Sequence, residues 1–177
     1  MGRKVILAPY DPLWVKQYEA AAGQLTAVFQ PILVAMHHIG STAIPGIKAK
    51  PTIDIMIVVT SVTAVEPLLP RMSGLGYLSK GENGIVGRHY FRKGSDTNHT
   101  HHVHVFGENH PEIARHLNFR DFLCHHQEDA QAYSQLKERL ARQFFTDPEA
   151  YTHQKTSFIQ EIDKKAHLWR RTQAVLS

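Results

Sequence analysis

One continuous apolar run constrains the fold more than any other part of the sequence. Residues 52–59 read TIDIMIVV, and Pro51 and Ser61 bound this run. β-Branched side chains favour extended backbone, and a strand that is apolar on both faces must be covered on both faces. The run therefore predicts a buried central strand that carries one charged residue, Asp54, in its interior.

The segments around this strand predict a mixed sheet followed by a helical tail. Apolar residues recur at helical spacing before the strand until Pro31, and strand and turn compositions alternate after it. This order indicates an α+β or α/β fold rather than an all-helical one. The predicted elements are helices at 14–29, 62–72, 113–124, 128–145 and 148–172, and strands at 32–36, 52–59, 85–92 and 100–106.

Composition predicts one domain and excludes several classes of protein. A chain of 177 residues with 42% hydrophobic content suffices for one core, so residues 1–177 are predicted to form a single domain. No run approaches the roughly 18 apolar residues of a membrane span, and no signal-peptide pattern opens the sequence, so we expect a cytoplasmic protein. The single cysteine, Cys124, excludes an internal disulfide. The net charge of +4 favours anionic partners, but the basic residues are scattered, which argues against nucleic acid.

A glycine-serine turn precedes the carboxylate of the central strand. At Gly40 and Ser41 the backbone can approach phosphate oxygens closely, while amides and the hydroxyl donate hydrogen bonds. Asp54 would then hold a Mg²⁺ ion that bridges the phosphates, in which case Asp54→Asn is expected to abolish metal-dependent nucleotide binding. Each feature alone also fits a structural role, but their joint spacing favours a phosphate site.

Two histidines of the last predicted strand offer a second kind of site. Strand alternation places His102 and His104 on one face and Val103 and Val105 on the other. With Asp54, the histidines would suit a softer metal such as Zn²⁺ or Mn²⁺. Solvated histidines on an open strand face fit the pattern equally well, and the sequence leaves both interpretations open.

Two lysines interrupt apolar stripes in the helical tail. Lys137 follows Tyr133 on one helical face, and Lys155 follows Tyr151 on another. Either the lysine stems pack inside while the amines reach water, or both amines share an anionic ligand. We expect both to converge on a cleft with Ser41 and Asp54. Lys50 and Arg88 would either meet phosphate there or be ordinary surface charges.

The segment HIGSTAIPGIKAKPTIDI, residues 38–55, closely resembles the signature of the GrpB family. That family resembles a branch of the nucleotidyltransferase superfamily, so the resemblance implies a nucleotidyltransferase-like mixed sheet flanked by helices with a helical C-terminal tail. In the superfamily a second acid stands two residues after the first, whereas this chain has Met56. The resemblance continues at Gly76-Tyr77, Arg88, His102 to Val105, Phe119 to Asp121, Tyr133, Leu136-Lys137, Tyr151 and Lys155 to Ile159.

The resemblance and the residues together imply a protein that binds a nucleotide or a related small phosphate ligand, with nucleotidyl or phosphoryl transfer left open. One alternative is a non-catalytic accessory module, because GrpB-like domains occur fused to dephospho-CoA kinase. Another is a metal-dependent hydrolase at a histidine-rich site. The predicted site comprises Asp54 as catalytic residue, Gly40, Ser41, Thr42, Lys50, Arg88, Lys137, Tyr151 and Lys155 as phosphate or nucleotide contacts, and Asp54, His102 and His104 as ligands of a divalent metal.

Overall fold

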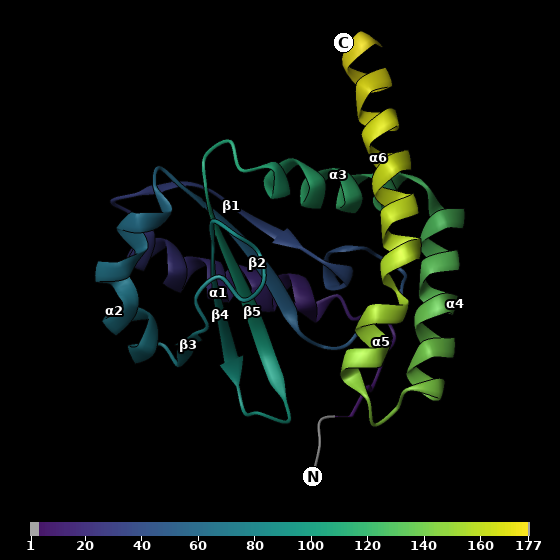
Figure 1. The fold of residues 1–177 in the computed structure, drawn as a ribbon, viewed down its shortest axis with the longest axis horizontal. Coiled ribbons are helices and arrows are strands. Elements are labelled where there is room, and N and C mark those ends of the chain that lie inside the picture. The colour runs from purple at the N-terminus through teal and green to yellow at the C-terminus, as the bar shows by residue number, and fades with distance from the viewer. Residues whose placement is uncertain (1–3, 177) are drawn as a thin grey trace.

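The computed structural model of the chain describes residues 4–176 (Figure 1). A five-stranded sheet stands between helices, and the last helices form the tail. In chain order the elements are α1 (Leu13–Phe29), β1 (Leu33–Ile39), the 3₁₀ helix η1 (Ser41–Ala43), β2 (Ile53–Val59), the 3₁₀ helix η2 (Val62–Leu68), α2 (Leu69–Gly74), β3 (Tyr77–Ser79), β4 (Arg88–Gly94), β5 (His99–Gly107), α3 (Pro111–His125), α4 (Gln127–Gln143), α5 (Pro148–Gln154) and α6 (Thr156–Leu176).

The sheet is mixed, with strand order β1-β2-β5-β4-β3. Only the β2–β5 pair is parallel, and the other neighbouring pairs are antiparallel. β2 is an interior strand, and Asp54 is its one residue that is not buried. The predicted α+β class, with a mixed sheet flanked by helices and a helical tail, is confirmed.

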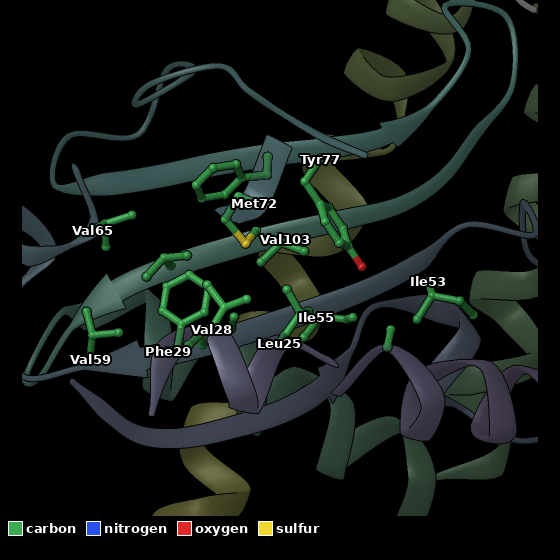
Figure 2. Close-up of a cluster of buried hydrophobic side chains, with 14 of the residues drawn as sticks. Leu25, Val28, Phe29, Ile53, Ile55, Val59, Val65, Met72, Tyr77 and Val103 are labelled. Atoms are coloured by element: carbon green, nitrogen blue, oxygen red, sulfur yellow. The ribbon is translucent and has the colours of Figure 1, made fainter. Parts of the chain in front are cut away.

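The main core lies between one face of the sheet and helices α1 and α2. Leu25 and Phe29 of α1 pack there against Ile55 and Val103, as Figure 2 shows. Strand alternation then turns the neighbouring residues Asp54 and His102 to the opposite face. The apolar residues of β2 and β5 therefore determine on which face the polar site lies.

Several element boundaries differ from the prediction. β1 continues to Ile39, because residues 36–39 pair with β2, whereas the sequence predicted a turn there. Residues 62–72 form η2 followed by the short helix α2, since Pro67 lacks the amide hydrogen that a regular helix needs. The fourth strand begins at Arg88 rather than residue 85.

The long final helix predicted for residues 148–172 is two helices. The start is as predicted, because the Asp147 side chain accepts a hydrogen bond from the Ala150 amide and Pro148 occupies the first turn. The chain then turns at Lys155 before α6 begins. Neither glycine nor proline stands at the break, so local sequence carries no signal for it.

Within residues 4–176, no helix combines the length and the apolar character that crossing a membrane requires.

Candidate functional site

A cavity of about 190 Å³ opens where the sheet meets the helical tail. Segments that are far apart in the sequence contribute its lining residues. They are the η1 turn, β2, β5, α4 and the turn between α5 and α6. Most of the phosphate contacts predicted from the sequence therefore share one cavity. Its lining residues are Ser41, Thr42, Lys50, Thr52, Asp54, His102, Lys137, Tyr151 and Lys155.

Three lysines lie against aromatic rings in this cavity. The Lys50 and Lys155 amines lie 4.8 and 4.3 Å from the Tyr151 ring centroid. The Lys137 amine lies 4.6 Å from the Tyr133 ring centroid and donates a hydrogen bond to the Lys48 carbonyl oxygen. Asp54 is the one carboxylate among the described lining residues, so the lining is electropositive.

Burial and neighbouring charges perturb the protonation of two of these amines, those of Lys137 and Lys155. Burial lowers the pKa of Lys137 to about 7, and the charges of Lys155 and Lys50 act in the same direction. Burial also lowers the pKa of Lys155 to about 8, Lys50 adds to the effect, and Asp54 opposes it. A bound anion would offset the repulsion and restore the ammonium forms.

Asp54 lines the same cavity as the lysines, and its side chain is 26% exposed. Its Oδ1 atom lies 3.3 Å from His104 Nε2 and 3.4 Å from His102 Nδ1. Burial acts to raise the pKa of Asp54, but the hydrogen bonds from the two histidines outweigh it and hold the pKa below its usual range. Asp54 is therefore a carboxylate with one oxygen already engaged.

The turn at Gly40 brings the backbone against this carboxylate. Gly40 has φ of +72°, and a Cβ atom at this position would lie 2.6 Å from Asp54 Oδ2. The next residue, Ser41, is hydrogen bonded to the buried Tyr133 hydroxyl, and the Thr42 hydroxyl lies 2.9 Å from His38 Nε2. Glycine is required here for both the backbone angle and the close approach.

Gly40→Ala is therefore expected to lower the free energy of unfolding by about 1–3 kcal/mol, since it adds backbone strain and a clash with Asp54. Urea denaturation would measure this. The matched control is Gly23→Ala in α1, where an added Cβ meets nothing within 4 Å. That substitution is expected to stabilise the protein by about 0.5–1 kcal/mol. Equal effects of the two substitutions would contradict the tight contact at Gly40.

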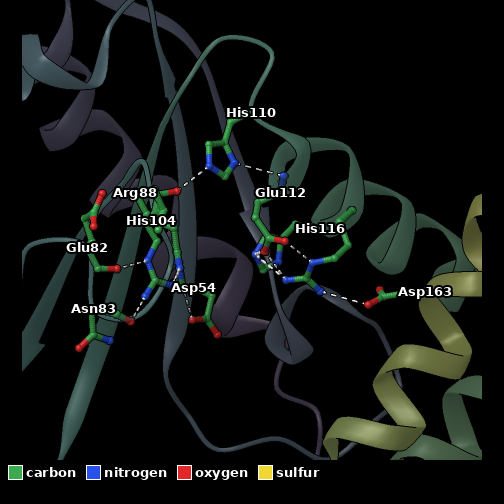
Figure 3. Close-up of polar contacts among 11 residues, drawn as sticks. Asp54, Glu82, Asn83, Arg88, His104, His110, Glu112, His116 and Asp163 are labelled. Carbon is green, nitrogen blue, oxygen red and sulfur yellow. Dashed lines mark hydrogen bonds and ion pairs between the residues drawn. The ribbon is translucent and has the colours of Figure 1, made fainter.

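The structure corrects the role predicted for Arg88. Its side chain lies outside the cavity, only 7% exposed. Its guanidinium donates to the carbonyl oxygens of Glu82 and Asn83 and contacts His104 Nδ1 at 3.3 Å, as Figure 3 shows. Arg88 thus stands apart from the residues that line the cavity, with Nε and Nη2 donating to main-chain oxygens and Nη1 against His104.

The structure brings the predicted metal ligands Asp54, His102 and His104 together, but not in an arrangement that would hold a metal ion. Met56 stands on the same sheet face as Asp54, but it is fully buried against Ile39 and Phe106 in a separate apolar cluster. Among the described residues, no group of three or more His, Cys, Asp or Glu side chains is arranged to hold a metal ion. His102 and His104 instead contact the Asp54 carboxylate directly.

The sequence did not single out several residues of the site. Thr52 lines the cavity and its hydroxyl donates to the His99 carbonyl oxygen at 2.9 Å. Arg92 lies 3.2 Å from a His99 ring nitrogen. Its spacing from Arg88 is a strand-face signal, but strand register was needed to place either arginine beside the histidines.

The fold and this cavity together define an α+β protein with a lysine-lined candidate site for an anion. The chain belongs to the GrpB family, because the family model described as "GrpB protein" matches residues 4–165. The solved structure of conserved protein GrpB from Enterococcus faecalis is similar, with a TM-score of 0.87 and 38% identity over 91% of this chain and 96% of that one.

Among curated relatives, UPF0157 protein YqkA of Bacillus subtilis is 41% identical over 96% of this chain and 49% of its own length. The chain spans 66% of the length of UPF0157 protein PA4798 of Pseudomonas aeruginosa, at 38% identity over 90% of this chain. A dephospho-CoA kinase of Mycolicibacterium paratuberculosis is 36% identical over 41% of this chain and 19% of its own length. The Cid1 poly(U) polymerase bound to MgATP has a TM-score of 0.48 at 13% identity over 73% of this chain and 45% of that one.

Proposed function

We propose that this protein binds the phosphate group of a small ligand, such as a nucleotide, in the lysine-lined cavity. One observation carries the proposal: three lysines from separate segments line a cavity in which, within residues 4–176, Asp54 is the one lining carboxylate. Burial, followed by repulsion from neighbouring lysines, lowers the pKa of Lys137 and Lys155, and a bound anion would oppose both effects. Ser41 and Thr42 add hydroxyl groups at the end of the cavity formed by the η1 turn.

The size of the cavity limits what it encloses. Sites that bury a drug-sized ligand usually measure about 300–1,000 Å³, and this cavity measures about 190 Å³. It suits a phosphate group with a short attached segment, while a larger ligand would extend out of the opening. We propose binding without nucleotidyl transfer, because Met56 replaces the second acid that such transfer uses to hold its metal ion.

The proposal is tested by Lys155→Met, which keeps most of the stem volume and removes the charge. The affinity for inorganic phosphate, pyrophosphate and ATP, measured by calorimetry, is expected to fall by about 1.5–3 kcal/mol, as for loss of a charge-assisted contact. Lys164→Met, at an exposed position of α6, is the matched control and is expected to bind like the parent. Absence of binding in the parent, or equal binding in both variants, would refute the proposal.

Phosphate affinity is also expected to depend on pH. Between about pH 7 and 9, Lys137 and Lys155 lose protons, so affinity should fall as pH rises. The facing tyrosines stay neutral in this range, because burial raises the pKa of Tyr133 to about 12 and that of Tyr151 further. Asp54 stays ionised as well, because the hydrogen bonds from His102 and His104 hold its pKa below the usual range.

The stability of the ligand-free protein should show the opposite trend. The lysine pKa values are lowered in the folded state, so the unfolded chain binds more protons above about pH 7 and the free energy of unfolding rises with pH. Calorimetric titrations and thermal unfolding across this range would measure both trends. An affinity that is constant from about pH 6.5 to 9 would contradict the role of the two lysines.

A second candidate is an accessory module that recognises a coenzyme A precursor. The partial match to a dephospho-CoA kinase favours it, since that match covers 41% of this chain. A thermal-shift series with dephospho-coenzyme A, 4′-phosphopantetheine and ATP would distinguish the candidates, because a ligand that binds only the folded state raises the midpoint by mass action. A shift with the pantetheine compounds alone would favour the accessory role.

A further inference from the structure

We propose that Asp54 accepts a hydrogen bond from a hydroxyl group of the bound phosphate ester, without an intervening metal ion. The ligand class is then a phosphate monoester that carries a free hydroxyl close to its phosphate. This inference rests on the proposed phosphate site and names what Asp54 recognises in that site. Four features of the structure lead to it.

The first feature is a chain of contacts from Arg88 to Asp54. Arg88 Nη1 lies 3.3 Å from His104 Nδ1, and a guanidinium can only donate hydrogen bonds. His104 Nδ1 must therefore accept, which leaves the ring proton on Nε2. That nitrogen lies 3.3 Å from Asp54 Oδ1, so His104 donates to the carboxylate (Figure 3).

The second feature is a longer chain that reaches the same oxygen. Arg92 Nη1 lies 3.2 Å from His99 Nε2, and by the same argument His99 carries its proton on Nδ1. His99 Nδ1 lies 3.0 Å from His102 Nε2, so the proton of His102 is placed on Nδ1. His102 Nδ1 lies 3.4 Å from Asp54 Oδ1.

The third feature is the state of the other carboxylate oxygen. Both histidine chains end on Oδ1, whereas Oδ2 has no hydrogen-bond partner within residues 4–176. An ionised carboxylate is an acceptor without a proton to donate. Because Asp54 lines the cavity, what it recognises there must bring a donor, and a hydroxyl next to a phosphate is such a donor.

The fourth feature is the distribution of charge across the cavity. Lys50, Lys137 and Lys155 already supply cationic groups for a phosphate dianion. The His102 and His104 nitrogens nearest Asp54 point their protons at its carboxylate, so they offer no lone pair to a metal ion there. A ligand whose phosphate contacts the lysines and whose neutral hydroxyl contacts the carboxylate would satisfy both kinds of lining group. The cavity measures about 190 Å³.

The test compares two esters that differ by one hydroxyl group, ethyl phosphate and 2-hydroxyethyl phosphate. Calorimetry with the parent protein and excess EDTA is expected to show about tenfold tighter binding of the hydroxyl ester, the effect of one hydrogen bond to a charged acceptor. Asp54→Asn keeps the side-chain shape and removes the charge. It should reduce the preference to about threefold or less and strengthen ethyl phosphate binding, because a negative charge near the phosphate is gone.

Lys155→Met provides the matched comparison. Removing a phosphate contact should weaken both esters by a similar factor and leave the hydroxyl preference unchanged. Loss of the preference in Lys155→Met but not in Asp54→Asn would overturn the assignment to Asp54.

The remaining outcomes separate this inference from the proposed function. If both esters bind the parent equally well, the hydroxyl contact is wrong and the phosphate site stands. If neither ester, inorganic phosphate nor ATP binds, the phosphate site fails as well. If binding appears only when Mg²⁺ replaces EDTA and Asp54→Asn abolishes it, Asp54 is a metal ligand and the inference is overturned.

Discussion

Met56→Asp is expected to lower the free energy of unfolding by about 3–5 kcal/mol, the cost of a buried charge without a partner. The substitution places a second acid two residues after Asp54, but in this fold the side chain at residue 56 is fully buried. It packs in a cluster with Ile39 and Phe106, next to Ile113 and Leu117 of α3. The new carboxyl group would be desolvated there, and its pKa would rise instead of supporting a metal ion.

Urea denaturation of Met56→Asp and Met56→Leu would measure this effect. The leucine variant nearly conserves volume and is expected to cost less than about 1.5 kcal/mol. The aspartate variant should become more stable towards acid pH, where the introduced carboxyl is neutral. The expectation would be contradicted if Met56→Asp were as stable as the parent and bound Mg²⁺. Helix α3 would then move aside at little cost, and the new carboxylate could act as a metal ligand beside Asp54.

The double substitution Lys137→Met with Lys155→Met is expected to reduce affinity for inorganic phosphate by about 100-fold or more, as two charge-assisted contacts are lost. Both side chains line the same cavity although Lys137 stands on α4 and Lys155 in the turn between α5 and α6. The free energy of unfolding of this variant should equal or exceed that of the parent. The reason is that burial and mutual repulsion disfavour both ammonium groups in the ligand-free fold. Binding and stability are thus expected to respond in different ways.

Calorimetry and thermal unfolding of this variant would be compared with Lys16→Met and Lys164→Met combined, which removes the same charge from exposed positions. The control is expected to keep phosphate affinity, apart from a small long-range effect that salt screens. A large loss of stability in the cavity variant would instead mean that the Lys137 hydrogen bond to the Lys48 carbonyl holds the tail in place. Unchanged phosphate affinity would show that the two lysines have a structural role and do not contact the phosphate.

Local pattern determined much of the fold. The β-branched run of β2 and the alternation of β5 predicted which side chains enter the core, and Val103 and Val105 are fully buried as expected. The same alternation placed His102 and His104 on the face of Asp54. These predictions succeed because side-chain direction in a strand depends only on position along the chain.

The helical tail shows where that reasoning ends. Apolar spacing predicted that Lys137 and Lys155 interrupt inward-facing stripes, and both side chains do reach the cavity. The turn at Lys155 separates α5 from α6, and neither proline nor glycine stands there to predict it from the sequence. The tertiary packing of the two helices sets that turn, so periodicity alone produced one long helix.

The sequence by itself determined the strand that carries Asp54, the glycine turn beside it and the faces on which the histidines and lysines lie. Only the tertiary structure decided that Arg88 supports His104, that both histidines end on Asp54 Oδ1, and that Met56 is sealed beneath α3. Face and spacing follow from local backbone geometry, which each short segment contains. Strand register, helix docking and the resulting proton positions depend on partners far away in the chain, and a single segment holds no information about them.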